Sequence, residues 1–354
     1  LAQGENKISV RLHGGLQVDF RLLPLESFGA AWQYFTGSQQ HNIGLRGRAQ
    51  QAGFKLNEYG LFREEGGERV AGAEEEEIYA ALGLAWIPPE LREASGEIEA
   101  AAAGTLPHLV AERDLLGDVH MHTTASDGRA SIEEMADAAA ARGYRYIAIT
   151  DHSQALAMAN GLDERRMLEH LARIRAAERS FQAAHPGFRI FAGVEVDILA
   201  DGRLDLADEV LAQLDVVIGS IHSRFDQSEA ETTARLVRAV NNPNLDILGH
   251  PSGRLLLRRE AYRYDFERVL ETCRERGVAV EINASPERLD LNHAQARRAK
   301  QRGVAVVINT DAHHPQHLAN IRYGLATARR GWLEPGDVLN TLPAEAFLRR
   351  LERH

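Results

Sequence analysis

Residues 144–152 read Tyr-Arg-Tyr-Ile-Ala-Ile-Thr-Asp-His, an apolar β-type run that ends in a carboxylate and an imidazole. Helical patterns lie on either side of it, and the clearest, 131–141, begins with a capping box formed by Ser131 and Glu134. Nearly continuous apolar strands that alternate with helices indicate a parallel sheet buried on both faces. We therefore predict an α/β fold, a barrel of parallel strands. Further apolar runs of the same kind lie at 188–196, 214–221, 245–249, 278–282 and 304–308.

Six strand-like segments end in side chains that can bind metal ions. The segment 117–119 leads into His120 and His122, and the side chains after the other segments are His152, Glu195, His222, His250, Asp311 and His313. The carboxyl ends of parallel strands in a barrel lie on one face, so we expect these groups to converge. Because side chains alternate along a strand, the rings of His120 and His122 point to the same side, as do Asp311 and His313.

Imidazole and carboxylate ligands together favour Mn, Zn or Fe over Ca or Mg. A carboxylate such as Glu195 can bridge two ions, which an imidazole nitrogen cannot. One histidine at a strand end is usually structural, but six histidines and several acids at one rim would cost several kcal/mol to bury without ions. The sequence therefore predicts a metal centre. For His314, which follows the candidate ligand His313, the sequence leaves open whether it binds metal. We expect the remaining histidines to be surface residues: His13, His41, His108, His170, His185, His293, His317 and His354.

Composition and charge narrow the class of protein. The single cysteine, Cys273, excludes a disulfide framework within the chain and a cysteine-based zinc finger. No apolar run reaches the roughly 18 residues of a membrane span, and no signal peptide is visible. We therefore expect a cytoplasmic protein without a membrane partner. The net charge of −10 argues against nonspecific nucleic-acid binding by the whole chain, but not against a local basic face or a substrate bound through metal.

The N-terminal third differs in charge and pattern from the rest. Residues 1–63 carry seven basic and four acidic side chains, whereas 64–116 are rich in glutamate. Alternating stretches at 8–12 and 16–22 predict a β-hairpin, which is too small to be stable alone. It therefore either packs on the residues after it or belongs to a longer protein. We expect 86–116 to be a connector with short helical pieces and a solvated acidic face.

Seven short motifs occur in order along the second part: HMHT at 120–123, SDG at 126–128, TDHS at 150–153, GVE at 193–195, HS at 222–223, GHP at 249–251 and NTDAH at 309–313. In this combination residues 117–330 resemble the polymerase-and-histidinol-phosphatase (PHP) superfamily. The resemblance implies an irregular seven-stranded α/β barrel with three divalent metal ions, Mn or Zn and alternatively Fe, at its C-terminal face.

By position, the resemblance implies a ligand set for each ion. The sets are His120, His122, Glu195 and Asp311 for the first ion, Glu195, His222 and His250 for the second, and Asp127, His152 and His313 for the third. The first set is also the implied catalytic set. Some family members have a histidine where this chain has Asp127, so we expect a third ion that is weaker or more Mn-like.

Residues 34–38, Tyr-Phe-Thr-Gly-Ser, are followed by an asparagine and an arginine in a pattern that resembles the end of a family X DNA polymerase. The resemblance implies that Tyr34, Phe35 and Gly37 contact the sugar of an incoming deoxynucleotide, that Asn42 reaches the base edge, that Arg46 lies near the template strand and that Asp19 is the third palm carboxylate at a Mg²⁺ site.

Bacterial family X polymerases carry a PHP domain at their C-terminus, so the two resemblances support each other. They imply a palm end and thumb-like fragment of α+β type at 1–85, an acidic linker at 86–116 and a PHP metal-dependent phosphoesterase domain at 117–354. Polymerisation needs two further carboxylates in an Asp-x-Asp, which the chain lacks. We therefore expect that this chain does not polymerise DNA and that Leu1 is not the natural start.

The first functional hypothesis is a metal-dependent phosphodiesterase, the 3′–5′ exonuclease of a bacterial DNA repair polymerase, acting on gapped or 3′-ended DNA near the nucleoid. Arg254 either clamps a phosphate or faces solvent. The alternatives are a phosphomonoesterase of the histidinol-phosphatase kind, which the shared ligands do not separate, and an inactive DNA-binding scaffold for the polymerase half. The polymerase-like N-terminal part favours DNA as the substrate.

Overall fold

The computed structural model describes residues 2–3 and 7–351 and divides the chain into two compact units, one up to Pro107 and one from His108 onward. This boundary falls within the segment 86–116 that we expected to connect two parts. No helix in the described part of the chain is both long and apolar enough to cross a lipid bilayer.

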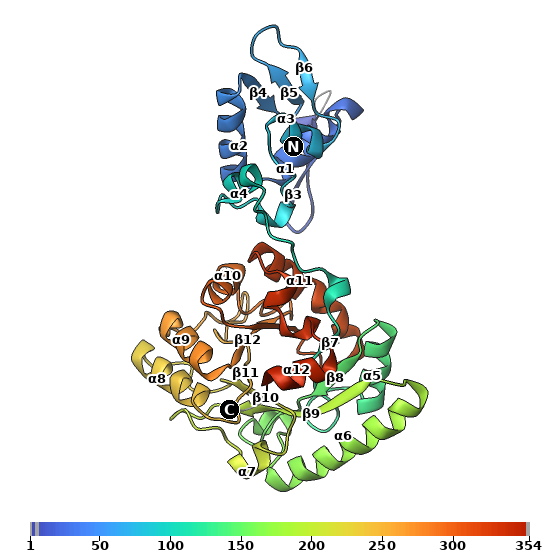
Figure 1. Cartoon of the computed structure of the whole chain (residues 1–354), viewed down its shortest axis with the longest axis vertical. Helices are drawn as coiled ribbons and strands as arrows, with labels where there is room; N and C mark the ends of the chain where they lie inside the picture. Colours follow the sequence, from blue (N-terminus) through green and yellow to red (C-terminus); the bar gives the residue numbers. More distant parts are fainter. Residues whose placement is uncertain (1, 4–6, 352–354) are drawn as a thin grey trace. The chain divides into compact units, whose positions relative to one another are not determined.

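The first unit contains the predicted hairpin and a second antiparallel sheet (Figure 1). The hairpin pairs β2 (Lys7–Arg11) with β3 (Gln17–Arg21), and β1 (Ala2–Gln3) pairs with the other edge of β2. The remaining elements of this unit are η1 (Leu25–Ser27), α1 (Phe28–Thr36), α2 (Gln39–Gln51), β4 (Phe54–Asn57), β5 (Gly60–Arg63), β6 (Arg69–Ala71), α3 (Glu75–Ala81), η2 (Pro89–Leu91) and α4 (Glu97–Ala103).

Two expectations about polar residues in this unit are wrong. His41, expected on the surface, is fully buried, with Nδ1 2.7 Å from Glu97 Oε1 and Nε2 3.0 Å from the Tyr79 hydroxyl. Glu97 lies in the segment expected to present a solvated acidic face, yet it is 1% exposed. Arg92 is buried as well and donates to both oxygens of Glu75 at 2.7 and 2.8 Å. These groups are buried because partners from distant parts of the sequence satisfy them.

In the described part of the second unit, seven parallel strands pair in chain order, which confirms the predicted barrel. Beyond the strand ends, Met121 and Ala312 form a parallel bridge, so the segment after the first strand lies beside the segment after the last. This contact closes the ring. The strands are β7 (Gly117–Asp118), β8 (Tyr146–Ile149), β9 (Arg189–Asp197), β10 (Val216–Ser220), β11 (Ile247–Leu248), β12 (Ala279–Asn283) and β13 (Val306–Asn309).

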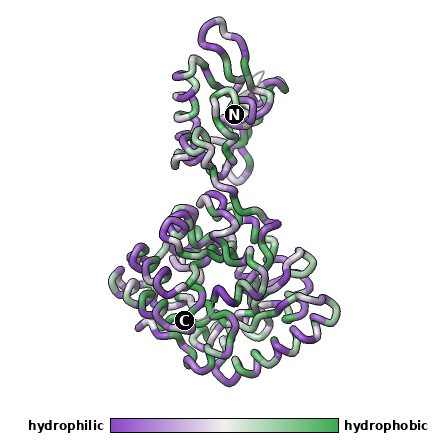
Figure 2. Tube along the Cα trace, viewed as in Figure 1, coloured by the Kyte–Doolittle hydropathy of each residue, from purple (hydrophilic) through white to green (hydrophobic). Residues whose placement is uncertain are grey.

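Helices surround these strands (Figure 1), and buried side chains of the strands belong to two apolar clusters. In β8, Tyr146 and Ala148 belong to one buried cluster, while Ile147 and Ile149 belong to the other. The strand is therefore apolar throughout, whereas α6 alternates between hydrophobic and hydrophilic residues (Figure 2). The helices are α5 (Ile132–Ala141), α6 (Glu164–Ala184), α7 (Asp208–Leu211), α8 (Glu229–Val240), α9 (Phe266–Arg276), α10 (His293–Gln301), α11 (Ile321–Arg330) and α12 (Ala344–Leu351). Short 3₁₀ turns accompany them at Glu112–Asp114, Ala157–Ala159, Pro315–Asn320, Pro335–Asp337 and Leu339–Thr341.

Helix α12 contributes to the buried cluster that contains Tyr146 and Ala148. Phe347 is fully buried, with its ring centroid 5.3 Å from that of Tyr146 and 6.1 Å from that of Phe191. Tyr146 is the first residue of β8, so this helix packs at the amino ends of the strands, opposite the candidate ligands.

Replacing Phe347 with alanine should therefore destabilise the barrel by about 3–5 kcal/mol, because a large buried ring is lost and a cavity remains. Urea denaturation followed by circular dichroism measures the change. Leu168→Ala is the control, since Leu168 on α6 is 39% exposed and its truncation should cost less than about 1 kcal/mol. Equal stability of the two variants would contradict this role for α12.

Candidate metal centre

The structure brings the nine candidate ligands together at the carboxyl ends of the strands. Ligand atoms that lie within 4.8 Å of one another form three groups: His122, Asp127, His152 and His313; His120, His122 and Asp311; and His152, Glu195 and His222. His250 is outside these groups, but its Nε2 is 2.8 Å from Glu195 Oε1. His122 and His152 each belong to two of these groups, whereas the family resemblance assigned each of them to a single ion. The assignment of ligands to individual ions stays a prediction.

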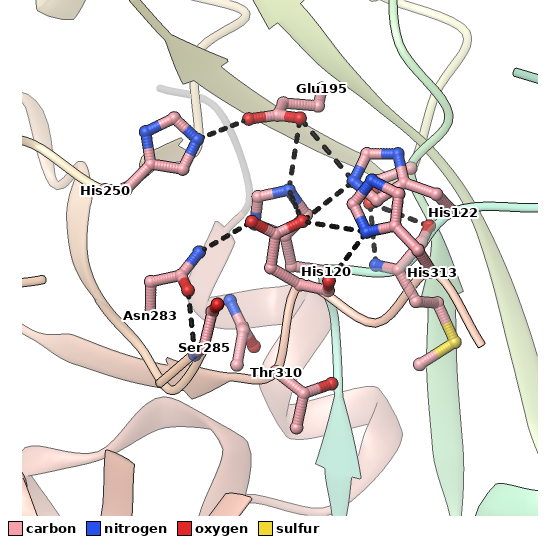
Figure 3. Close-up of polar contacts among 12 residues, drawn as sticks. His120, His122, Glu195, His250, Asn283, Ser285, Thr310 and His313 are labelled. Carbon is pink, nitrogen blue, oxygen red and sulfur yellow. Dashed lines mark hydrogen bonds and ion pairs between the residues drawn. The ribbon is translucent and has the colours of Figure 1, made fainter. Parts of the chain in front are cut away.

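Glu195 lies at the middle of the cluster, and its two oxygens face different imidazoles (Figure 3). Oε1 faces Nε2 of His250 at 2.8 Å and Nε2 of His222 at 3.3 Å. Oε2 faces Nδ1 of His152 at 2.9 Å, Nε2 of His120 at 3.3 Å and Nε2 of His122 at 3.5 Å. Burial alone would raise the pKa of Glu195, but the neighbouring imidazoles outweigh it and hold that pKa well below its usual range. An ionised carboxylate in this position is suited to bridging two cations.

Asp311 completes the inner part of the cluster. Its Oδ1 is 3.1 Å from Nε2 of His122 and 3.7 Å from Nε2 of His120. Its Oδ2 points the other way and accepts from the Asn283 side-chain amide at 3.1 Å. Burial and the charges of neighbouring imidazoles lower the pKa of His122 to about 4, so this ring is neutral, as a metal ligand must be.

Asp127 marks the outer edge of the cluster. Its Oδ1 lies 3.4 Å from Nε2 of His313, 3.6 Å from Nε2 of His152 and 4.0 Å from Nδ1 of His122. The side chain is 35% exposed, against 1% for Glu195. A cation held here would therefore meet solvent and substrate first.

The donor set fits divalent metal. Five buried imidazole nitrogens have no hydrogen-bond partner among the described residues, and four of them belong to candidate ligands: His120 Nε2, His122 Nδ1, His152 Nδ1 and His250 Nδ1, the fifth being His170 Nδ1. Buried polar atoms are nearly always satisfied. His120 Nε2 and His152 Nδ1 face Glu195 and His122 Nδ1 faces Asp127 without forming hydrogen bonds, so these three nitrogens fit ligands of a cation. Mixed nitrogen and oxygen donors suit a transition metal.

Strand β12 contributes a residue that sequence reasoning missed. Glu281 is fully buried, and its Oε1 is 2.7 Å from Nδ1 of His120. The same carboxylate accepts from the Asn309 side chain at 2.9 Å and from the backbone N–H of His250 at 2.8 Å. This contact fixes the ring of His120 with Nε2 turned toward the centre. The signal was a carboxylate within the apolar run 278–282, since an acid in a buried strand needs a partner.

Asp151 and His170 support the loop that carries Asp127. The carboxylate of Asp151 accepts from Thr123 N and Oγ1 at 2.8 and 2.7 Å and from Ser126 Oγ at 2.5 Å. Nε2 of His170 on α6 lies 2.8 Å from its Oδ2. The expectation that His170 is a surface residue is therefore wrong, because it is 1% exposed and paired with a buried acid.

Arg254 is half-buried, and two of its three side-chain nitrogens bind backbone carbonyls. Its Nε donates to the backbone carbonyl of Arg288 at 2.8 Å, and its Nη2 donates to the carbonyl of Leu289. The guanidinium therefore holds the loop after β12 in place.

The candidate nucleotide-binding residues lie in the first unit. Tyr34, Phe35 and Gly37 lie at the end of α1, where Phe35 is 49% exposed. Asn42 is buried: its Oδ1 accepts from Gln33 at 2.7 Å and its Nδ2 donates to the Tyr34 carbonyl at 2.8 Å, so its amide is used within the unit. The exposed Asp19 pairs with Lys7 in the hairpin at 2.9 Å, and Arg46 is exposed one turn after Asn42. Their nucleotide-binding roles stay predictions.

Fold and cluster together define a metal-dependent phosphoesterase, and comparison with known proteins agrees. Residues 118–285 match the PHP domain family, and residues 31–93 match the DNA polymerase beta thumb family. The chain is 34% identical to a probable phosphatase of Caldanaerobacter subterraneus, over 56% of the chain and 76% of that protein. The chain belongs to the PHP family, and it carries the domain in the arrangement of the C-terminal part of a family X DNA polymerase.

Two more similarities give the extent of the match. The chain is 44% identical to the DNA polymerase/3′-5′ exonuclease PolX of Bacillus subtilis over 99% of its own length, and it spans 61% of the length of that protein. A crystal structure of histidinol phosphate phosphatase from Lactococcus lactis, complexed with zinc, L-histidinol and phosphate, aligns with a TM-score of 0.44 and 17% identity over 60% of this chain and 93% of that one.

Replacing Glu281 with glutamine should weaken metal binding about 10- to 100-fold, because His120 loses the anionic partner that orients it. Competition with a chromogenic chelator, using Mn²⁺ or Zn²⁺, measures the affinity. Glu271→Gln on α9, where the side chain is 42% exposed, is the matched control and should bind metal as the wild type does. Unchanged affinity in the Glu281 variant would show that the contact is dispensable.

Proposed function

We propose that this chain is a metal-dependent phosphodiesterase that removes nucleotides from the 3′ end of DNA, the 3′–5′ exonuclease part of a bacterial repair polymerase. The observation that supports it most is the position of Glu195, whose oxygens lie 2.8 Å from His250 and 2.9 Å from His152 on opposite sides. With its oxygens turned toward separate imidazoles, Glu195 could serve as a ligand to two cations. Such pairs are the usual machinery of phosphodiester cleavage.

Bound divalent ions, Mn²⁺ or Zn²⁺, supply a water of near-neutral pKa and neutralise charge on the phosphate. The residues of the chain position the participants. Glu195 and Asp311 fix the inner ligand atoms, and Glu281 prevents the ring of His120 from turning. The exposed Asp127 lies with His152 and His313 at the edge of the centre where the phosphate of a substrate would arrive. Because these groups are fixed before substrate binds, little reorganisation accompanies reaction.

The N-terminal unit supports DNA as the substrate. Residues 31–93 match a polymerase thumb family, and a relative that is 44% identical is named as a polymerase and 3′-5′ exonuclease. We infer that gapped or 3′-ended DNA is the partner, in the cytoplasm of a bacterium near its nucleoid. In a protein that also supplies the Asp-x-Asp carboxylates, Asp19 and the residues around Tyr34 would serve a Mg²⁺-dependent site for a deoxynucleotide.

A phosphomonoesterase is the second candidate. Several relatives, among them one that is 34% identical, are named probable phosphatases, and the ligand groups do not distinguish the two reactions. A scaffold role is less favoured, because all nine candidate ligands are present and converge.

With Mn²⁺, the chain should shorten a 5′-labelled oligonucleotide from its 3′ end and release mononucleotides, and EDTA should abolish the activity. His120→Ala and Glu195→Gln should each reduce the rate at least about 100-fold with unchanged circular dichroism, since each removes an inner ligand. His185→Ala, with a side chain 42% exposed, is the matched control and should retain the rate.

A phosphomonoester run in parallel separates the candidates. Release of phosphate from the monoester without shortening of DNA would replace the proposal with the phosphatase. Binding of DNA with neither reaction would favour the scaffold.

A further inference from the structure

A pocket of about 370 Å³ opens beside the metal centre, between the loop after β12 and the segment after β13. Its volume lies in the range of small-ligand sites. Two candidate metal ligands, Asp311 and His313, form part of its wall, so a molecule held by cations at these ligands would reach into it. The lining includes Leu255, Ser285, Arg288, Asp311, His313 and His317.

Arg288 is the cation of this pocket. Its side chain is only 16% exposed, and its Nε lies 3.5 Å from Asp311 Oδ2. Its Nη1 is buried and has no hydrogen-bond partner among the described residues. A buried guanidinium donor without an acceptor is costly, and here it lies next to groups that would hold further positive charge. The group that would satisfy it is an anion.

The position of Arg288 relative to Asp311 indicates which anion would bind to it. Oδ1 of Asp311 faces His122 at 3.1 Å, whereas Oδ2 faces Arg288. Arg288 is therefore separated from the cation positions by the width of a carboxylate. A guanidinium on this far side of Asp311 would be free to meet a second phosphate of a strand whose first phosphate is held at the cluster.

The loop is held so that the guanidinium stays in place. Arg254 donates to the backbone carbonyl of Arg288 at 2.8 Å, and the backbone N–H of Leu256 donates to the carbonyl of Glu287 at 2.7 Å. The N–H of Ser285 donates to Asn283 Oδ1 at 3.0 Å, and Asn283 in turn contacts Asp311. A preorganised guanidinium is the side chain best suited to a phosphate.

We propose that Arg288 binds a phosphate next to the scissile one, so that this pocket selects a nucleic-acid strand over small phosphate esters. The inference rests on the proposed exonuclease function and names its specificity-determining residue. It predicts that Arg288 contributes to substrates with a second phosphate and not to the cleaved group itself.

Arg288→Gln should lower kcat/KM for oligo(dT) roughly tenfold or more, mainly through KM, because a charged hydrogen bond to a non-reacting group is lost. The rate on bis(p-nitrophenyl) phosphate, a diester without a second phosphate, should change less than about twofold. The plot of log kcat/KM for oligo(dT) against log salt should become shallower by about one charge, and Arg288→Lys should restore the slope. Bound metal, measured by elemental analysis, should be unchanged.

Arg142→Gln is the matched control, because Arg142 follows α5 at the opposite end of the barrel and pairs with the exposed Glu112. It should leave both substrates and the salt slope unaltered. An equal loss on both substrates with loss of metal would overturn the proposal and show that Arg288 only positions Asp311. No loss on either substrate would overturn it as well. Failure of the wild type to cleave DNA at all would instead overturn the proposed function.

Discussion

The carboxyl face of the barrel depends on the burial of one carboxylate, Glu195, among five imidazoles. A charge in a dry interior is tolerated only with opposite charges and hydrogen bonds close by. Imidazoles alone meet that need poorly, because they repel one another once protonated: the charges of His152 and His313 are part of what lowers the pKa of His122 to about 4. Metal cations resolve the conflict, since they bind neutral rings and the carboxylate together. The contacts that would bind the metal ions are therefore also the contacts that would stabilise this rim.

The barrel separates that rim from the part that stabilises the fold. Phe347 of α12 packs against Tyr146 and Phe191 near the strand starts, while the ligands lie at or just after the carboxyl ends of the strands. Closure occurs on the ligand side, where Met121 pairs with Ala312. This bridge sets His120 and His122 beside Asp311 and His313, residues almost two hundred positions apart. Parallel barrels commonly divide function and stability between their two ends in this way.

The fold and the convergence of ligands could be predicted from the sequence because both follow from local patterns. Apolar runs such as 146–150 identify buried strands, and the period of two aligns His120 with His122. Burial of single polar groups could not be predicted this way. His41 and His170 are buried because Glu97 and Asp151 meet them from elsewhere in the chain. For Glu281, an acid within the apolar run 278–282 signals that a buried partner exists, but not that the partner is His120, 161 positions away. Pairing across the fold decides such cases, and local sequence does not record it.

Charge at the rim would also allow a chain with a net charge of −10 to take the polyanionic substrate proposed for it. With a divalent ion in each of the three groups, six positive charges would face the carboxylates of Asp127, Glu195 and Asp311 and that of Glu281 behind His120. The rim would then carry a local excess of positive charge, and Arg288 beside Asp311 adds to it. Close fields outweigh distant ones, because salt screens charges separated by more than about 10 Å. The acidic outer surface therefore has little effect at the centre, and the metal content of the rim determines the sign of the charge that a substrate meets.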